Sequence, residues 1–160
     1  MVNQKGTKNV SEIDYGILDT LIGYKLRRAQ VSFFNGFAER FSKYGITPGL
    51  FGVLSVVKNN PGSTQTSIAN ALGNDRSAMV GVVDRLEGLN LVERKPAIQD
   101  RRSHALFLTE EGEKFYKKMI KEVKLHEQEY YSLLEEGEKE MLMDILERFA
   151  AVHPSSVTKS

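Results

Sequence analysis

The feature of this sequence that most restricts its fold is a pair of short helical patterns joined by only about three residues. The segment "TQTSIANALG" has an apolar stripe and stops at Gly73, and "RSAMVGVVDRLEGLN" has a second stripe that begins after Asn74 and Asp75. Ser63 or Thr64 is the expected N-cap of the first helix, and Asn74 or Asp75 that of the second. Such a short turn between two helices that each bury one face is typical of a helix-turn-helix.

Two short strand patterns, "LVER" and "HALFLT", follow the second helix directly. The loop between them is longer than a tight hairpin would use. Residues 94–102 hold four cations, Arg94, Lys95, Arg101 and Arg102, and one acid, Asp100. We expect nothing local to neutralise these cations, so their partner is expected outside the chain. An ordinary solvated hairpin loop is the alternative interpretation.

A helix-turn-helix followed by a two-stranded ribbon is a winged helix. In this motif the second helix enters the major groove of DNA, and the ribbon reaches along the backbone toward the minor groove. Arg102 at the tip of the ribbon can enter a narrow groove, where negative potential is concentrated, and Asp100 can orient its guanidinium by accepting hydrogen bonds. The pattern therefore predicts a DNA-binding lobe over residues 47–109, in which Arg101 contacts a phosphate.

Long amphipathic helices are expected on both sides of this lobe, within residues 12–46 and 110–152. Thr47 with Pro48 favours the start of a buried helix, and Thr109 favours the start of the helix after the ribbon. The compact middle cannot cover both terminal helices, so we expect a second copy of the chain to do so. Residues 12–44 are predicted to form one helix because their apolar residues recur at steps of three and four: Leu18, Ile22, Leu26, Ala29, Phe33, Phe37 and Phe41.

The predicted fold class is mostly α (α+β), with residues 1–160 as a single domain. The net charge of +1 favours no particular partner, but the charges are unevenly distributed. Residues 1–109 hold 14 Lys/Arg and 9 Asp/Glu, whereas residues 110–148 hold 7 Lys/Arg and 12 Asp/Glu. This asymmetry is expected of a protein that presents one face to a polyanion, although a solvated charge pattern without functional meaning would explain it as well.

Three segments resemble the MarR family of bacterial winged-helix regulators: "DRSAMVGVVDRLE", the Asp-x-Arg motif at Asp100–Arg102, and "FLTEEG". With "IGYKLRRAQ" on the first helix, the resemblance covers roughly residues 17–125. It implies a homodimer held by its N- and C-terminal helices, with two winged lobes on a palindromic operator in double-stranded DNA. It also implies a response to a small, often phenolic or aromatic, anion that binds between the dimer region and the DNA-binding lobes.

The predicted recognition helix departs from the pattern of the family it resembles. Family members often have Thr or Ser at the positions of Ala78 and Val80, and a large polar residue at the position of Gly81. Here Arg76 and Ser77 remain as polar readers near the helix N-terminus. Ala78 and Val80 can instead contact thymine methyl groups, and Gly81 allows the backbone to come close.

Arg85, further along the same helix, is predicted to have a different role. It follows Asp84 directly in the sequence. We expect these two residues to form a structural or phosphate-positioning pair, which would fix the helix on DNA without reading bases.

A candidate ligand site lies in "YKLRRAQVSFF" on the first helix. Tyr24, Arg27 and Arg28 fall within neighbouring turns, and Phe33 and Phe34 follow. Two arginines beside aromatic rings can hold a carboxylate or a phosphate against a π surface. The pattern predicts a small aromatic anionic effector, such as a carboxylate or a coenzyme A thioester. The alternative is that the arginines pair with acids of another helix, for instance in the acidic C-terminal segment.

The sequence gives little support to other classes of function. It has no nucleophile elbow, no Walker ending and no metal-ligand spacing among its three histidines, so we expect no enzyme, no metal and no cofactor. His126 is predicted to pack at an interface, with ligand binding as the alternative. The rival function within the same fold is a winged-helix module that binds another protein instead of an operator.

The expected location is the cytoplasm. The sequence has no cysteine, which removes disulfides and thiol chemistry. It has no run of about 18 apolar residues that would predict a membrane span, so no membrane partner is expected. The segment "MVNQKGTKNVSE" lacks the apolar core of a signal peptide.

Overall fold

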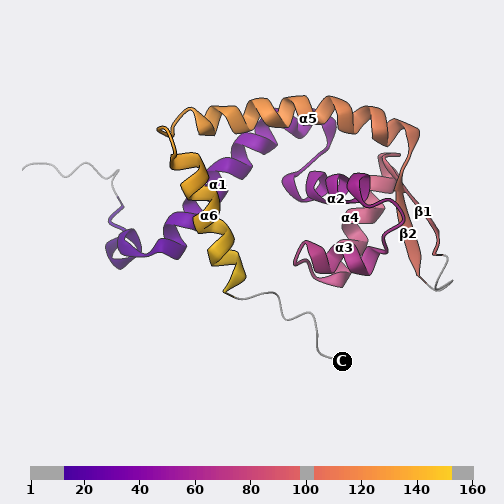
Figure 1. The fold of residues 1–160 in the computed structure, drawn as a ribbon, viewed down its shortest axis with the longest axis horizontal. Helices are drawn as coiled ribbons and strands as arrows, with labels where there is room; N and C mark the ends of the chain where they lie inside the picture. Colours follow the sequence, from indigo (N-terminus) through magenta and orange to yellow (C-terminus); the bar gives the residue numbers. More distant parts are fainter. Residues whose placement is uncertain (1–12, 98–102, 153–160) are drawn as a thin grey trace, which may run out of the picture. The chain divides into compact units, whose positions relative to one another are not determined.

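The computed structural model describes residues 13–97 and 103–152 of the chain. It is mostly helical with one two-stranded sheet, which confirms the predicted fold class. The chain divides into two compact units whose boundary lies between Gly36 and Phe37. The elements follow in the order η1 (Gly16–Thr20), α1 (Ile22–Phe41), η2 (Ser42–Tyr44), α2 (Pro48–Asn59), α3 (Gln65–Ala71), α4 (Arg76–Gly88), β1 (Val92–Pro96), β2 (His104–Leu108), α5 (Glu110–Tyr131) and α6 (Glu138–Ala151) (Figure 1).

The prediction of one helix over residues 12–44 is wrong near both ends. The 3₁₀-helix η1 comes first, and Leu21 is extended before α1 begins. The hydroxyl of Thr20 donates to the Ile17 carbonyl oxygen at 2.8 Å, and the Leu21 amide bonds to Leu18 instead. An α-helix would need that Ile17 carbonyl for the Leu21 amide. At the other end α1 tightens into η2 and stops at Gly45, whose φ of +66° is left-handed.

The N-caps that the sequence predicts are present in the second unit. Thr47 caps α2, Thr64 caps α3, Asp75 caps α4 and Thr109 caps α5, each by accepting a hydrogen bond from a backbone amide in the first turn. Where the sequence allowed two candidates, the structure selects Thr64 and Asp75. Such a cap stabilises a helix by about 1 kcal/mol because it satisfies an amide without an intrahelical partner.

The hydrophobic core lies in the second unit. It forms where α2, α3, α4 and the ribbon pack on one another and on the start of α5. The two helices of the helix-turn-helix bury the faces that the sequence predicts. Each fully buried aliphatic side chain contributes about 1.5–3 kcal/mol. The fully buried side chains of this core include Val53, Leu54, Val57, Ile68, Met79, Val83, Leu86, Leu106 and Met119.

The ribbon is attached to the helix-turn-helix along β2. Strands β1 and β2 are antiparallel, with Val92 opposite Leu108 and Pro96 opposite His104. The free side of β2 bonds to the loop between α2 and α3, because the Gly62 amide donates to the Leu106 carbonyl at 2.9 Å and the Leu106 amide donates to Ser63 at 3.0 Å. The ribbon therefore begins as an extension of the core.

The start of α5 is locked onto the turn between α4 and β1. The Thr109 hydroxyl donates to the Asn90 carbonyl at 2.6 Å, and the Thr109 amide donates to the Leu91 carbonyl at 3.1 Å. Gly112 lies against the same carbonyl, since a Cβ built on it would come 1.9 Å from the Leu91 oxygen. We refer to Asn90, Leu91, Thr109 and Gly112 as the α4–β1–α5 junction.

Helix α5 buries Gly112, Tyr116, Met119 and His126 along one side. Tyr116 is buried, and its neighbour Phe115 is half-buried against the same core. The Tyr116 ring stacks on Phe51 at a centroid distance of 5.9 Å, and its hydroxyl shares a hydrogen bond of 3.0 Å with Ser55. The polar tip therefore finds a partner that phenylalanine could not use.

His126 is packed, as predicted, but between α1 and α5 of one chain. Its side chain is 1% exposed. Its ring meets Phe37, Phe41 and Tyr130 edge-on at centroid distances of 5.7, 6.2 and 5.2 Å. These contacts hold the last turns of α1 on α5 within the second unit.

Helix α6 folds back from the far end of α5 after Gly137, whose φ is +83° (Figure 1). No residue of α6 is buried in the single chain. Its exposed apolar side chains are Met141, Leu142, Met143, Leu146 and Phe149. In the first unit, Ile13, Ile17, Leu21 and Ile22 are also exposed.

We predict that Gly112→Ala lowers the free energy of unfolding by more than about 2 kcal/mol, because the new Cβ would overlap the Leu91 carbonyl. The better helix propensity of alanine offsets this by only about 1 kcal/mol. Urea denaturation followed by circular dichroism measures the change. Gly52→Ala in α2 is the matched control, since its Cβ would meet open space. Equal stability of Gly112→Ala and wild type would contradict the close contact.

Candidate nucleic-acid interface

Helix α4 exposes the residues that the sequence predicts to read DNA. Its inner face is buried through Met79, Val83 and Leu86. Val80 leaves 45% of its surface exposed, and a Cβ built on Gly81 would have no heavy atom within 4 Å. Another molecule can therefore approach the backbone closely here. By the helical repeat, the outer face, which we call the reading face, gathers Ser77, Val80, Gly81, Asp84 and Arg85, with Arg76 and Ala78 at its edges.

Asp75 fixes the N-terminus of α4. Its Oδ1 accepts hydrogen bonds from the backbone amides of Ser77 at 2.8 Å and Ala78 at 3.3 Å, and also from the Ser77 hydroxyl. These hydrogen bonds, foremost the one from the Ser77 hydroxyl, lower the pKa of Asp75 below its ordinary value because they favour the charged form. The hydroxyl proton of Ser77 is thus used within the protein, and its oxygen remains an acceptor.

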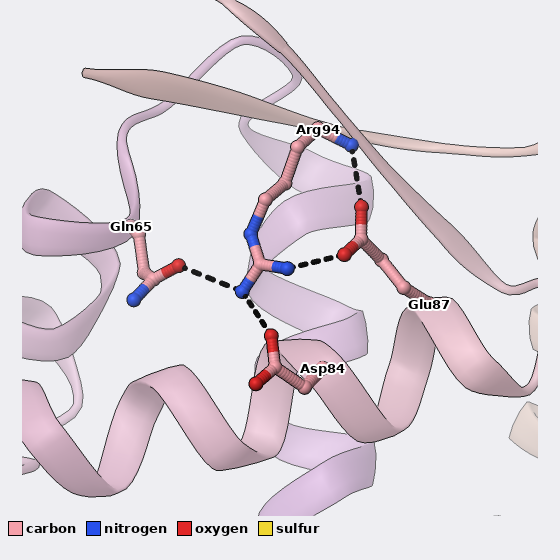
Figure 2. Close-up of polar contacts among 4 residues, drawn as sticks. All are labelled: Gln65, Asp84, Glu87 and Arg94. Atoms are coloured by element: carbon pink, nitrogen blue, oxygen red, sulfur yellow. Dashed lines mark hydrogen bonds and ion pairs between the residues drawn. The ribbon is translucent and has the colours of Figure 1, made fainter. Parts of the chain in front are cut away.

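Arg94 in β1 is not the unneutralised cation that the sequence suggested. Its Nη2 lies 2.7 Å from Asp84 Oδ1 and 3.2 Å from Gln65 Oε1, and its Nη1 pairs with Glu87 Oε2 (Figure 2). Its backbone amide donates to Glu87 Oε1 at 3.0 Å. We call these four residues the Arg94 network. It joins α3, α4 and the base of the ribbon.

The predicted pairing of Asp84 with Arg85 is wrong, because Asp84 pairs with Arg94. Adjacent residues of a helix point in different directions, whereas β1 runs alongside α4. Arg85 is exposed on the reading face, and a Cβ built on Gly45 would lie 3.3 Å from its Nη2. The guanidinium of Arg85 therefore reaches the turn before α2.

Lys95 also has local partners. Its Nζ lies 2.7 Å from Glu93 Oε1 and 5.0 Å from the centroid of the Phe107 ring. The expectation that nothing local neutralises the cations of the ribbon is therefore wrong for Arg94 and Lys95. Asp100, Arg101 and Arg102, the predicted residues of the wing tip, lie outside the described residues.

The Arg94 network was not predicted from the sequence, although a signal for it exists. Asp84 and Glu87 are three residues apart, so a helix places both on neighbouring turns of one side. Arg94 is the third residue of the first described strand of the ribbon. The contact could be inferred only by assuming that this strand passes beside the carboxylates.

Two of the predicted ligand residues come together on α1 through a third that was not predicted. The guanidinium of Arg28 lies 5.2 Å from the centroid of the Tyr15 ring, and the Tyr15 ring lies 5.8 Å from the Tyr24 ring. A cation over the face of a ring is attracted by its quadrupole. This cluster of Tyr15, Tyr24 and Arg28 belongs to the first unit and offers two rings and one guanidinium.

The other predicted ligand residues lie outside this cluster. Arg27 and Phe34 are exposed on α1. Phe33 is half-buried, and it follows Tyr24 by about two and a half helical turns. Phe33 therefore faces away from Tyr24 and Arg28, and it cannot join them in one pocket wall.

In the parts of the chain that the structure describes, no group of three or more His, Cys, Asp or Glu residues is arranged to hold a metal ion. None of the helices in residues 13–97 and 103–152 is both long and apolar enough to cross a membrane.

Comparisons with known proteins find similarity to one family and to transcriptional regulators. A model of the MarR family matches residues 44–103. A protein of Thauera aromatica, whose name assigns it to regulation of the hcr operon, is 34% identical over 141 residues, which cover 88% of this chain and 85% of that protein. The transcriptional repressor CouR, solved on a 23-mer DNA duplex, is 38% identical with a TM-score of 0.81, covering 88% of this chain and 99% of CouR. CouR solved with p-coumaroyl-CoA is 36% identical with a TM-score of 0.80, covering 87% and 98%.

We predict that Ser77→Ala raises the pKa of Asp75 toward its ordinary value, because the hydroxyl is the largest of the groups that stabilise this carboxylate. The pKa of Asp75 is lowered on folding, so its contribution to stability is complete above the ordinary value of 3.8 and is lost as the pH falls further. In Ser77→Ala the loss should begin at a higher pH. NMR titration of the carboxyl carbon measures both proteins.

Ser67→Ala is the control for this titration. The Ser67 hydroxyl donates to the Thr64 backbone carbonyl at 2.8 Å, at the start of α3, and not to a carboxylate. The pKa of Asp75 should not change in this variant. An unchanged pKa in Ser77→Ala as well would mean that the hydroxyl does not stabilise the Asp75 charge.

Proposed function

The chain belongs to the MarR family of winged-helix transcriptional regulators, and on that premise we propose that it is a ligand-responsive repressor. It binds an inverted-repeat operator as a homodimer and is released by a small aromatic anion. The observation that carries the DNA-binding part is the reading face of α4, whose side chains are exposed, small or polar, beside a ribbon built into the same core. The repressor CouR on its DNA duplex supports the same assignment.

The proposed base contacts follow from the chemistry of the first two turns of α4. Arg76 offers guanidinium donors, which suit the O6 and N7 acceptors of guanine. The Ser77 hydroxyl donates its hydrogen bond to Asp75, so its oxygen is left as an acceptor, which suits the amino groups of adenine or cytosine. Ala78 and Val80 suit thymine methyl groups, and Gly81 lets the backbone come near.

Positioning on the DNA backbone is assigned to cations at two places. Arg85 is exposed on the reading face and is proposed to contact a phosphate. Arg101 and Arg102 at the wing tip are proposed to contact phosphate and the minor groove, with Asp100 orienting Arg102. These contacts make binding salt-dependent, which separates an operator-binding protein from a winged-helix module that binds only another protein.

The proposed dimer uses the apolar surfaces that a single chain leaves exposed. Helix α6 has no buried residue, and the first unit exposes Ile13, Ile17 and Ile22. Soluble monomers rarely expose contiguous apolar surface of this kind. A second copy of the chain is the proposed occupant, since membership of the MarR family supports a dimer and an inverted repeat needs two lobes.

We predict that the wild-type protein is a dimer by light scattering at micromolar concentration, and that it protects an inverted repeat whose half-sites lie about one helical turn apart. The double variant Leu142→Gln/Phe149→Gln removes two exposed apolar side chains from α6. It should dissociate and bind the full repeat no more tightly than a single half-site. Glu140→Gln/Glu147→Gln, on the other side of α6, should remain dimeric. A folded wild-type monomer, or a footprint on one asymmetric half-site, would contradict this proposal.

The proposed effector site is the cluster of Tyr15, Tyr24 and Arg28, with Arg27 and Phe34 next to it on α1. An aromatic carboxylate or its coenzyme A thioester offers a ring for the tyrosines and negative charge for a guanidinium. CouR with p-coumaroyl-CoA supports an effector of this class. A tenfold loss of DNA affinity requires only about 1.4 kcal/mol of coupling between the effector and DNA.

We predict that titration calorimetry with benzoates, cinnamates and their coenzyme A thioesters identifies a ligand that weakens DNA binding. Arg28→Ala and Tyr15→Leu should each lower its affinity on the order of tenfold, the loss of one strong contact. Arg27→Ala should lower it less, because Arg27 lies outside the cluster. If no member of the panel binds, or if binding ignores the Arg27 and Arg28 variants, the arginines are structural and the effector binds elsewhere.

A further inference from the structure

DNA recognition requires that the wing keep a fixed position on the recognition helix, and this position has to be set by contacts within the protein. Arg94 makes such contacts. We propose that Arg94 is a positioning residue, which holds the base of the wing at one place on the recognition helix. Helix and ribbon then meet the DNA in a single register. This inference rests on the proposed DNA-binding function and adds a residue that acts through others.

The geometry of Arg94 is that of a two-point attachment. Its backbone amide and its guanidinium each bond to a different oxygen of Glu87, and the guanidinium also reaches Asp84 (Figure 2). A single hydrogen bond would let β1 rotate about it, whereas bonds from both the backbone and the side-chain end fix distance and twist together. Gln65 adds a contact from α3 at 3.2 Å.

The attachment also completes the anchoring of the ribbon. The inner side of β2 is bonded to Gly62 and Ser63, in the loop between α2 and α3. The outer side of β1, at the residue opposite Leu106, is bonded to Glu87 of α4. The two sides of the ribbon are thus held by different parts of the DNA-binding lobe. Arg94 bonds β1 to the recognition helix α4 through both Glu87 and Asp84.

The network also lies at the edge of the reading face. The Asp84 side chain is 58% exposed and the Glu87 side chain 33%, whereas the Arg94 side chain is 20% exposed. Two carboxylates beside bound phosphates would weaken binding by like-charge repulsion, and Arg94 neutralises one of them in net charge. Removing Arg94 therefore has two possible effects, a loosened wing and uncovered carboxylates, and an experiment must separate them.

A role limited to stability fits the geometry less well. Ion pairs with partners this exposed contribute little to the free energy of unfolding. The core of the same unit is built from apolar side chains such as Leu86 and Leu106, which are fully buried. We therefore expect substitutions of Arg94 to change DNA binding more than the melting temperature.

The test uses four variants of the full-length protein and a duplex that the wild type selects from a randomised pool. Arg94→Met removes the attachment and the charge, and Arg94→Lys keeps the charge without the planar fork. Arg94→Met/Asp84→Asn/Glu87→Gln removes the attachment but leaves no uncovered carboxylate. Lys95→Met is the matched control, because it removes one cation from the same strand without touching α4. Fluorescence anisotropy gives affinity, hydroxyl-radical footprinting gives the protected positions, and thermal melting verifies the fold.

We expect Arg94→Met to lose at least about tenfold in affinity, which corresponds to roughly 1.4 kcal/mol, with protection lost at the outer flanks and kept where α4 binds. The triple variant should bind DNA about as weakly as Arg94→Met, and Arg94→Lys should bind more tightly than Arg94→Met but less tightly than the wild type. Lys95→Met should change the affinity for DNA less than about threefold, as for loss of one phosphate contact. Full recovery in the triple variant would show that Arg94 only neutralises carboxylates, and wild-type affinity in Arg94→Met would also overturn the inference. Failure of the wild type to select any duplex would instead count against the proposed function.

Discussion

The contact of Gly112 with the Leu91 carbonyl constrains the whole second unit, because three elements leave from this one point. Helix α4 ends just before it, β1 begins at it and α5 starts on it. Asn90 enters the turn with a φ of +57°, and the Thr109 hydroxyl closes it by bonding to Asn90. A side chain at position 112 would separate α5 from the turn, so the direction of α5 relative to the recognition helix is set by the absence of one methyl group.

This junction matters for function because α5 is long. Its 22 residues span roughly 33 Å, so a tilt of about ten degrees at the junction moves its far end by roughly 6 Å. In the proposed dimer, binding to an operator with two half-sites would be sensitive to displacements of this size, since the two lobes would have to match a spacing of about 34 Å. An effector that favours one direction of α5 by a small free-energy difference can therefore lower DNA affinity substantially, provided that it binds the two arrangements unequally.

The sequence predicts the parts of this structure that local chemistry decides. Thr47, Asp75 and Thr109 cap their helices because a side-chain oxygen next to free amides needs no tertiary context. The break at Leu21 was missed because the apolar periodicity continues across it, whereas the Leu21 amide bonds to Leu18 and not to Ile17. The hydrogen bond of the buried Tyr116 hydroxyl to Ser55 joins α5 to α2, and such a tertiary contact has no signal in the local sequence. The partners of Arg94 were missed for a similar reason, since Asp84 and Glu87 become its neighbours only when β1 lies along α4. The exposed face of α4, whose residues are proposed to read DNA, could be named because a helix-turn-helix fixes which face is exposed.

The composition of the reading face makes the position of the wing more important than it would be on a more polar helix. The Ser77 hydroxyl donates its hydrogen bond to Asp75, and Ala78, Val80 and Gly81 have no side-chain hydrogen-bonding groups, so few bidentate base contacts are possible. With little discrimination from hydrogen bonds, more of it must come from methyl contacts and from the shape of the DNA. Shape is read only by a protein whose helix and ribbon are held at a fixed separation, because a loose ribbon would fit wide and narrow grooves alike. The carboxylates of Asp84 and Glu87, which would be a disadvantage on an isolated DNA-binding helix, provide that fixed separation by binding Arg94.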